Sequence, residues 1–348
     1  MDLYFLEFRD PLFGIIIFFV ILFVIAFFSY WFNKLKKQED YKHLDNFLKQ
    51  FQTPPSQNEL EVLISKGELS ERSWLLLANA FTKSGNYDKS IEIYTQLLKV
   101  GDKANYRDTL FLLGKTFYMA GFLERARQTF LEILKNNPRT PQALSYLMLV
   151  YEQMKNYSAA IEILEPLGEL KKDVNAEEAY LNSLCTLNEQ KFTIEQKVQK
   201  LLETYKQTNQ MTYMIFEYLF RVSPKIAWEN LDTSKASLIV DILWRCDKKD
   251  LNFDIIMQNS YLRELYSAKR YIEDAKSSPI FEFDVLINLN PNTNATLGFE
   301  YVCDNCKHTF PFAFHRCTNC HTIDRMSVEL LIVKDYYRNF SEESNSFL

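Results

Sequence analysis

Residues 113–138, which read LGKTFYMAGFLERARQTFLEILKNNP, decide the fold expected for this chain. Apolar residues recur there at helical spacing on both sides of a central glycine, which predicts two amphipathic helices joined by a tight turn. The small residues Gly114 and Ala126 alternate with the large residues Phe117 and Phe130. Small side chains let paired helices approach closely, and large aromatic side chains fill the gap between neighbouring pairs. The stretch therefore predicts one unit of a stacked helical array.

The same residue types return before and after this stretch in a frame of about 34 residues, which resembles the tetratricopeptide repeat. The flanking units supply Trp74, Leu77, Ala78, Phe81, Ser90 and Tyr94 on one side, and Leu147, Tyr151, Ala160 and Leu164 on the other. Residues 85–87, 121–123 and 155–157 fall at equivalent turns between helices. Three matching units predict a helical solenoid.

Beyond about residue 175 the consensus residues are lost, but helical periodicity continues. Further helices are predicted at Ala179–Leu187, Ile194–Tyr205, Met211–Val222, Ala236–Cys246 and Leu251–Ala268. The predicted solenoid therefore extends over residues 71–275, and the fold class is mainly α.

Four cysteines near the C-terminus, Cys303, Cys306, Cys317 and Cys320, form two CxxC pairs separated by ten residues. Each pair aims two sulfur atoms at one point, and the intervening loop is long enough to bring the pairs face to face. This spacing predicts a tetrahedral site for one zinc or iron ion, whereas two disulfides or four unrelated buried thiols are the alternative readings.

The residues around these cysteines predict a small β-rich domain. Phe281–Leu289 and Met326–Val333 are β-rich runs, and we expect them to pair and carry the two CxxC turns. His308, His315 and His321 lie close to the quartet, but four thiolates already complete a tetrahedron, so the histidines are interpreted as neighbouring groups. Cys185 and Cys246 lie in helical stretches and are expected in the core.

The N-terminal region contains an uncharged apolar run over residues 12–32, LFGIIIFFVILFVIAFFSYWF. At about 1.5 Å per residue, a helix of roughly 20 residues spans a bilayer core. Lys34, Lys36 and Lys37 follow this run, so the positive-inside rule places the remainder of the chain in the cytoplasm. The sequence predicts an uncleaved transmembrane anchor.

The predicted organisation follows from these segments. It comprises a periplasmic tail (1–11), a transmembrane helix (12–32), a juxtamembrane segment (33–70), the solenoid (71–275), a rubredoxin-like or zinc-ribbon metal-binding domain (276–340) and a polar tail (341–348).

Charge and motif content narrow the possible functions. The net charge of −5 over 348 residues, without a sustained basic stripe, argues against a nucleic-acid partner. The sequence has no phosphate-binding glycine loop and no nucleophile elbow, and a site with four thiolates leaves no open coordination position. We therefore expect a protein that is not an enzyme.

The order of anchor, repeats and cysteine quartet resembles the bacterial lipopolysaccharide assembly protein B family, especially over residues 74–167 and 301–320. The resemblance implies an inner-membrane adaptor that faces the cytoplasm and helps an FtsH-type protease degrade an LpxC-type deacetylase, which restrains lipopolysaccharide synthesis. A scaffold for another envelope complex and a rubredoxin-type electron carrier are the alternatives. Homo-oligomerisation is left open. Rubredoxin-type turns usually have glycine where this chain has Lys307 and His321.

Overall fold

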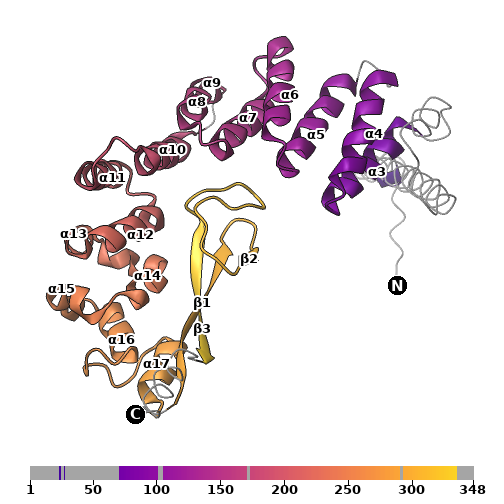
Figure 1. The fold of residues 1–348 in the computed structure, drawn as a ribbon. Helices are drawn as coiled ribbons and strands as arrows, with labels where there is room; N and C mark the ends of the chain where they lie inside the picture. Colours follow the sequence, from indigo (N-terminus) through magenta and orange to yellow (C-terminus); the bar gives the residue numbers. More distant parts are fainter. Residues whose placement is uncertain are drawn as a thin grey trace, which may run out of the picture. The chain divides into compact units, whose positions relative to one another are not determined.

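The computed structural model describes residues 23–24, 27, 70–100, 105–170, 173–290 and 293–334. The chain divides into two compact units, Met1–Met154 and Lys155–Leu348 (Figure 1). No helix among the described ranges is long and apolar enough to cross a membrane. The predicted transmembrane segment lies outside these ranges, apart from three of its residues.

The described part of the first unit contains helices in antiparallel succession. They are α3 (Glu71–Lys83), α4 (Tyr87–Val100), α5 (Tyr106–Met119), α6 (Leu123–Asn136) and α7 (Pro141–Gln153). Gly85 and Gly121 occupy the turns of the two hairpins with φ of 80° and 79°. Glycine adopts this left-handed backbone without a steric cost, so each hairpin reverses in a short turn.

Close packing between helices follows the predicted alternation of small and large residues. Ala126 and Phe130 of α6 are fully buried, and the ring of Phe130 covers Gly114 of α5. The hydroxyl groups of Thr82 and Thr116, which are 34 residues apart, lie 3.2 Å from each other. Equivalent positions of successive repeats thus meet in the core, and the repeat prediction is confirmed.

The described part of the second unit contains both short helices and helices of 14 and 15 residues. They are α8 (Tyr157–Glu162), α9 (Leu164–Glu169), α10 (Asn175–Asn188), α11 (Ile194–Thr208), α12 (Thr212–Val222), α13 (Pro224–Asn230), the 3-10 helix η2 (Thr233–Ile239), α14 (Val240–Arg245), the 3-10 helix η3 (Lys248–Asp250), α15 (Phe253–Gln258), α16 (Ser260–Ala268) and α17 (Phe281–Asn288).

Two of the predicted helices are interrupted in the structure. The run Ala236–Cys246 is divided between η2 and α14. The run Leu251–Ala268 is divided at Asn259, whose side chain accepts a hydrogen bond from the amide of Leu262 and caps α16. An asparagine favours such a cap over a helix interior, which explains the break.

A three-stranded antiparallel sheet with strand order β2-β1-β3 completes the second unit. Its strands are β1 (Ala295–Cys303), β2 (Thr309–Phe310) and β3 (Met326–Lys334). In the register, Tyr301 faces Val328 and Cys303 faces Met326. β1 lies against α14 (Figure 1), and β3 packs against η2.

The predicted pairing partner of β3 is wrong, because Phe281–Leu289 does not form a strand. It forms α17, which buries Phe283 and Leu286 on one face. The carboxylate of Asp284 also accepts a hydrogen bond from the amide of Ser278, just before the helix. Side chains three residues apart share a helix face, so the run satisfies a helical pattern as well as an alternating one. The strand that pairs with β3 is Ala295–Cys303.

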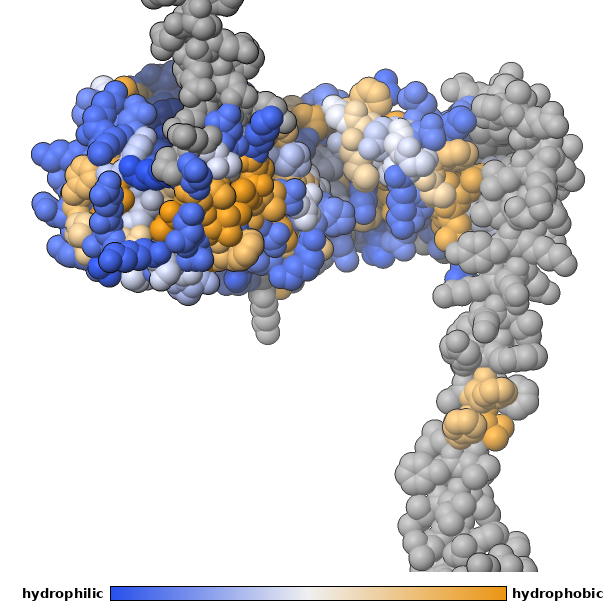
Figure 2. Space-filling view, turned by 90° about the horizontal axis from the view of Figure 1, so that it is seen from below, coloured by the Kyte–Doolittle hydropathy of each residue, from blue (hydrophilic) through white to orange (hydrophobic). Residues whose placement is uncertain are grey.

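The surface carries apolar groups among polar ones, and Figure 2 shows one larger hydrophobic area. In the described part of the second unit, Phe281 and Phe312 are 70% and 79% exposed. Singly exposed rings are ordinary on a protein surface, and only a contiguous apolar patch marks a binding area.

Candidate metal centre

Two turns with matching backbone hydrogen bonds hold the four cysteines. We call them the first knuckle (residues 303–308) and the second knuckle (317–322), and residues 293–334 the cysteine module. In the first knuckle, the Lys307 amide donates to the carbonyl of Cys303, and the Cys303 amide donates to the carbonyl of His308. In the second, the same two bonds join His321, Cys317 and Thr322. The two turns therefore have the same architecture.

The residue after the second cysteine of each knuckle has a left-handed backbone, with φ of 58° at Lys307 and 61° at His321. Glycine adopts this conformation freely, whereas a residue with a Cβ pays roughly 1–2 kcal/mol. The turn that rubredoxin-type knuckles make with glycine is thus made here without it. A strained pair of turns indicates that their geometry is held by the surroundings of the site.

The four sulfur atoms converge on a single point. The Sγ atoms of Cys303 and Cys320 are 3.6 Å apart, as are those of Cys306 and Cys317. All four lie within 4.8 Å of one another. A tetrahedron with bonds of about 2.3 Å has edges of about 3.8 Å, so the quartet fits a single zinc ion or an ion of similar size.

Hydrogen bonds already favour the thiolate form at two of these cysteines. For Cys306, the Asn319 side chain and the His308 amide lower the thiol pKa. For Cys320, burial opposes ionisation, but the Asn305 side chain and the Thr322 hydroxyl and amide lower the pKa to about 5. Burial raises the pKa of Cys317 to about 12. A bound cation would supply the charge that ionisation of this buried thiol requires.

The structure places the other predicted cysteines and histidines outside the quartet. Cys185 and Cys246 are half-buried in the helical region. The Nε2 atom of His315 lies 3.2 Å from a carboxylate oxygen of Glu217, and Nδ1 of His308 lies 3.3 Å from the amide nitrogen of Asn319. These two histidines thus lie beside the site.

The cysteine module is fixed to the helices by a buried carboxylate, that of Asp241 on α14. Its Oδ2 atom accepts hydrogen bonds from the hydroxyl groups of Tyr213 on α12, at 2.7 Å, and Tyr301 on β1, at 2.8 Å. The Asp241 side chain is 0% exposed, and Arg245 lies 3.6 Å from Oδ2. Burial, followed by the hydrogen bond to this carboxylate, raises the pKa of Tyr301 to about 12. One carboxylate therefore joins two helices and the strand that ends in Cys303.

Two further contacts hold the second knuckle side of the module. The Asp324 carboxylate accepts a hydrogen bond of 2.9 Å from the Met211 amide at the start of α12. The guanidinium group of Arg316 lies 4.9 Å from the centre of the Tyr180 ring. The sequence does not reveal these contacts, because the two residues of each pair are more than 100 positions apart.

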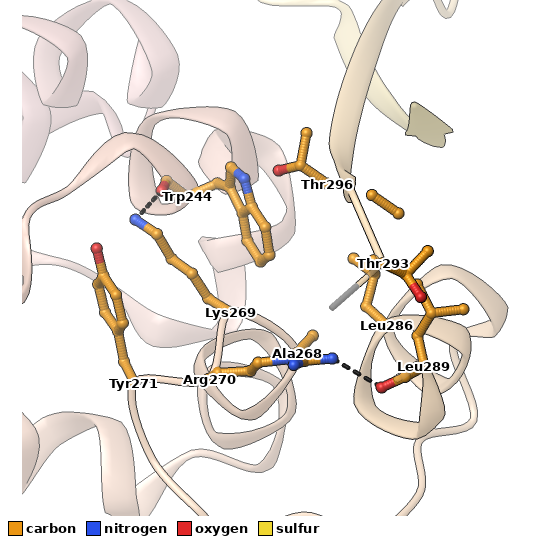
Figure 3. Close-up of a pocket in the computed structure, with 10 residues that line it drawn as sticks. Trp244, Ala268, Lys269, Arg270, Tyr271, Leu286, Leu289, Thr293 and Thr296 are labelled. Atoms are coloured by element: carbon orange, nitrogen blue, oxygen red, sulfur yellow. Dashed lines mark hydrogen bonds between the residues drawn. The ribbon is translucent and has the colours of Figure 1, made fainter. Parts of the chain in front are cut away.

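A pocket of about 450 Å³ lies between α14, the end of α16, α17 and the start of β1 (Figure 3). The Lys269 ammonium group donates hydrogen bonds to the carbonyls of Trp244 and Cys246, and Arg270 donates one of 2.7 Å to the carbonyl of Leu289. Both cations thus bond carbonyl groups at the C-terminal ends of helices. These hydrogen bonds tie α16 to the neighbouring helices α14 and α17.

Comparison with known proteins agrees with the repeat prediction and with the family resemblance. The tetratricopeptide repeat family matches residues 75–139 and 111–165. Lipopolysaccharide assembly protein B of Haemophilus influenzae is 26% identical over 146 residues, which cover 41% of this chain and 35% of that protein. The protein of the same name from Escherichia coli K12 is 28% identical over 101 residues, which cover 28% of this chain and 26% of that protein. The matched segment therefore spans about a third or less of these relatives.

Two solved structures resemble this chain only loosely. MamA from Desulfovibrio magneticus RS-1 superposes with a TM-score of 0.37 at 16% identity, covering 48% of this chain and 93% of MamA. A tetratricopeptide repeat protein from Parabacteroides merdae gives a TM-score of 0.39 at 15% identity, covering 72% of this chain and 96% of that structure. The resemblance to the lipopolysaccharide assembly protein B family, stated from the sequence, is confirmed as a partial similarity.

Proposed function

We propose that this protein is a membrane-anchored, non-enzymatic adaptor that restrains lipopolysaccharide synthesis by delivering an LpxC-type deacetylase to an FtsH-type protease. The observation that carries the proposal is the similarity to lipopolysaccharide assembly protein B from two organisms, in a chain that also has tetratricopeptide repeats and a cysteine quartet. The name of those relatives indicates the process, which is lipopolysaccharide assembly. The FtsH-type protease and the LpxC-type substrate are inferred from the family resemblance.

The helical region would supply the binding surface. Stacked helical pairs offer extended surfaces that hold a segment of another protein. Holding a substrate and a protease on one chain raises the local concentration of the substrate, so no catalytic group is needed in the adaptor.

The cysteine module would act as a structural cap. Cys303, Cys306, Cys317 and Cys320 would hold one ion, and that ion would contribute folding free energy to a domain whose own apolar core is small. Four protein ligands leave no position for a substrate. The chain's own groups, through Asp241 and its two tyrosines, would then keep the cap against the helices.

The anchor belongs to the proposal as well. We assign residues 12–32 to the inner membrane and the remainder of the chain to its cytoplasmic side, because the lysines follow the apolar run. This arrangement would place the helical region on the side of the membrane where a cytoplasmic deacetylase is degraded.

The test is the half-life of the deacetylase in the native organism after this protein is depleted and translation is blocked. We expect the half-life to lengthen, and to return when the full chain is supplied again. Resupply of residues 33–348 without the anchor is the matched comparison, and it should restore turnover poorly. An unchanged half-life on depletion would overturn the proposal and favour a scaffold for a different envelope complex.

A further inference from the structure

The pocket between α14, the end of α16, α17 and the start of β1 belongs neither to the repeats nor to the metal centre (Figure 3). We call it the Trp244 pocket. Its volume of about 450 Å³ falls within the range of about 300–1,000 Å³ that is usual for small-molecule sites. Its lining residues all belong to the second unit, so a single compact body shapes it.

The described residues that line the pocket include two cations, Lys269 and Arg270, and no carboxylate. The carboxylate of Asp247 also acts on Lys269, but it is exposed and lies 3.6 Å from the ammonium group of Lys249. The carbonyls that accept hydrogen bonds from the two cations lie at the ends of α14 and α17, and a helix end carries only about half a negative charge. Two full positive charges exceed two partial negative ones, so the pocket favours an anion.

Several hydrogen-bond donors of the pocket have no acceptor in the described part of the chain. The Lys269 ammonium group uses two of its three donors, and the Arg270 guanidinium group uses one of its five. The indole N–H of Trp244 and the hydroxyl groups of Thr293 and Thr296 form no hydrogen bond with a described residue. Figure 3 shows these side chains around the same space. Their donors are therefore available to a ligand.

Arg270 occupies a backbone position that usually belongs to glycine. Its φ is 62°, its amide donates to the carbonyl of Ser267, and the next amide, that of Tyr271, donates to the carbonyl of Tyr266. This pair of hydrogen bonds is the Schellman ending of a helix, where glycine avoids the steric cost of a left-handed residue. A charged side chain kept at such a cost points to a role for its guanidinium group.

We propose that the Trp244 pocket binds a phosphate monoester. The phosphate group accepts hydrogen bonds from Arg270, Thr293 and Thr296. The aromatic or apolar body of the ligand packs against the Trp244 ring and Leu286. A phosphate group has three strongly accepting oxygens, which suit donors that arrive from two different elements, and arginine binds such groups through parallel N–H donors. This site does not depend on the adaptor function proposed above.

The experiment is calorimetric titration of phenyl phosphate into the purified full-length chain in detergent micelles, with chain-free micelles as the blank. Inorganic phosphate lacks the apolar body, and phenol lacks the charge. We expect saturable binding of phenyl phosphate at one site, at least about 10-fold tighter than either fragment, because the pocket contacts both parts. No saturable binding of phenyl phosphate, or equal binding of either fragment, would overturn the proposal.

Arg270→Gly removes the guanidinium group and keeps the turn, because glycine adopts the left-handed backbone freely. It should bind phenyl phosphate about 10- to 100-fold more weakly, as expected for the loss of hydrogen bonds to a charged group. Lys155→Gly is the matched control, since it removes one positive charge from another exposed left-handed residue, with φ of 58°, outside the pocket. Equal affinities of these two variants would contradict the proposal. Thr296→Val removes one hydroxyl group and keeps the branched shape, so it provides a second test, with a smaller expected loss, if Arg270→Gly does not fold.

Amide hydrogen exchange locates the bound ligand. Phenyl phosphate should slow exchange in the last turn of α16 and at the start of β1, because the ligand contacts both elements, while the amides of the first unit keep their rates. Protection that appears only in other segments would place the ligand elsewhere and overturn the assignment.

Discussion

Removing the hydroxyl group of Tyr301 is a direct test of how the cysteine module is held. In Tyr301→Phe the ring stays in the core, so little apolar contact is lost. The buried carboxylate of Asp241 loses one of its two tyrosine donors and keeps Tyr213. Arg245 lies 3.6 Å from the Asp241 carboxylate, but its side chain is 66% exposed. Water therefore screens its charge, and it replaces little of the lost hydrogen bond.

The expected cost follows from the charge of the acceptor. A hydrogen bond to a charged group contributes about 1.5–3 kcal/mol, against about 0.5–1.5 kcal/mol for a neutral pair. At about 1.4 kcal/mol per tenfold change, the equilibrium for detachment of the module should rise about 10- to 100-fold. The control is Tyr266→Phe, because the Tyr266 hydroxyl donates to the neutral carbonyl of Leu243 at 2.9 Å. Loss of this hydrogen bond should lower the free energy of unfolding by less than half as much and leave the module in place.

Amide hydrogen exchange measures this detachment locally. In Tyr301→Phe, the amides of β1 and α12 should exchange faster, while those of the first unit keep their rates. Adding Tyr213→Phe leaves the carboxylate with no tyrosine donor, so the double variant should lose more than the sum of the single losses. If Tyr301→Phe is no more costly than Tyr266→Phe, the buried carboxylate does not hold the module and the reasoning is wrong.

Three other perturbations probe packing, charge and the metal. Gly114→Ala should destabilise the first unit by about 1–2 kcal/mol in urea unfolding, because its new Cβ would lie 2.9 Å from a buried phenylalanine ring. Gly168→Ala should be neutral or stabilising by up to about 1 kcal/mol, since its Cβ would make an ordinary 3.7 Å contact. The hydrogen bond from His315 holds the pKa of Glu217 below 4.5. The pair should therefore stabilise the protein by no more than about 1 kcal/mol above about pH 4.5, and this stabilisation should be lost as the pH falls through the folded pKa of Glu217. In Glu217→Gln, acid titration of the free energy of unfolding should lack this loss. Chelation of the ion, or Cys303→Ser, should open the cysteine module to protease while helical circular dichroism persists.

Each of these has an outcome that would count against it. Equal effects of the two glycine variants would show that the close approach in the first unit is not a constraint. If the native protein and Glu217→Gln lose stability equally in acid, the ion pair of Glu217 does not contribute. A variant without bound metal that resists protease and keeps full activity would refute the structural role of the quartet.

The helical repeats could be predicted from the sequence because their signal is local. The alternation of small and large residues recurs within one 34-residue frame, and the turn glycines mark the hairpins. The convergence of the four cysteines was equally accessible, since CxxC spacing nearly determines where the sulfurs lie. In both cases residues that are close in sequence determine the local geometry.

The attachment of the module could not be predicted in this way. Asp241 and Tyr301 are 60 residues apart, and neither belongs to a motif. The run Phe281–Leu289 was wrongly predicted as a strand for a related reason. Its alternating large residues fit a strand, but Phe283 and Leu286 also fall on one helix face, and only the packing against α16 and the sheet decides between the two.

The strand β1 places two of these groups on one face, because Tyr301 and Cys303 are separated by a single residue. The first is tied to the helices through a buried carboxylate, and the second contributes a sulfur to the quartet. A shift of this strand by one residue would turn both side chains to the opposite face at once. A one-residue slip of this strand as a whole would therefore disturb metal binding and attachment together, so the two properties depend on one register of the chain.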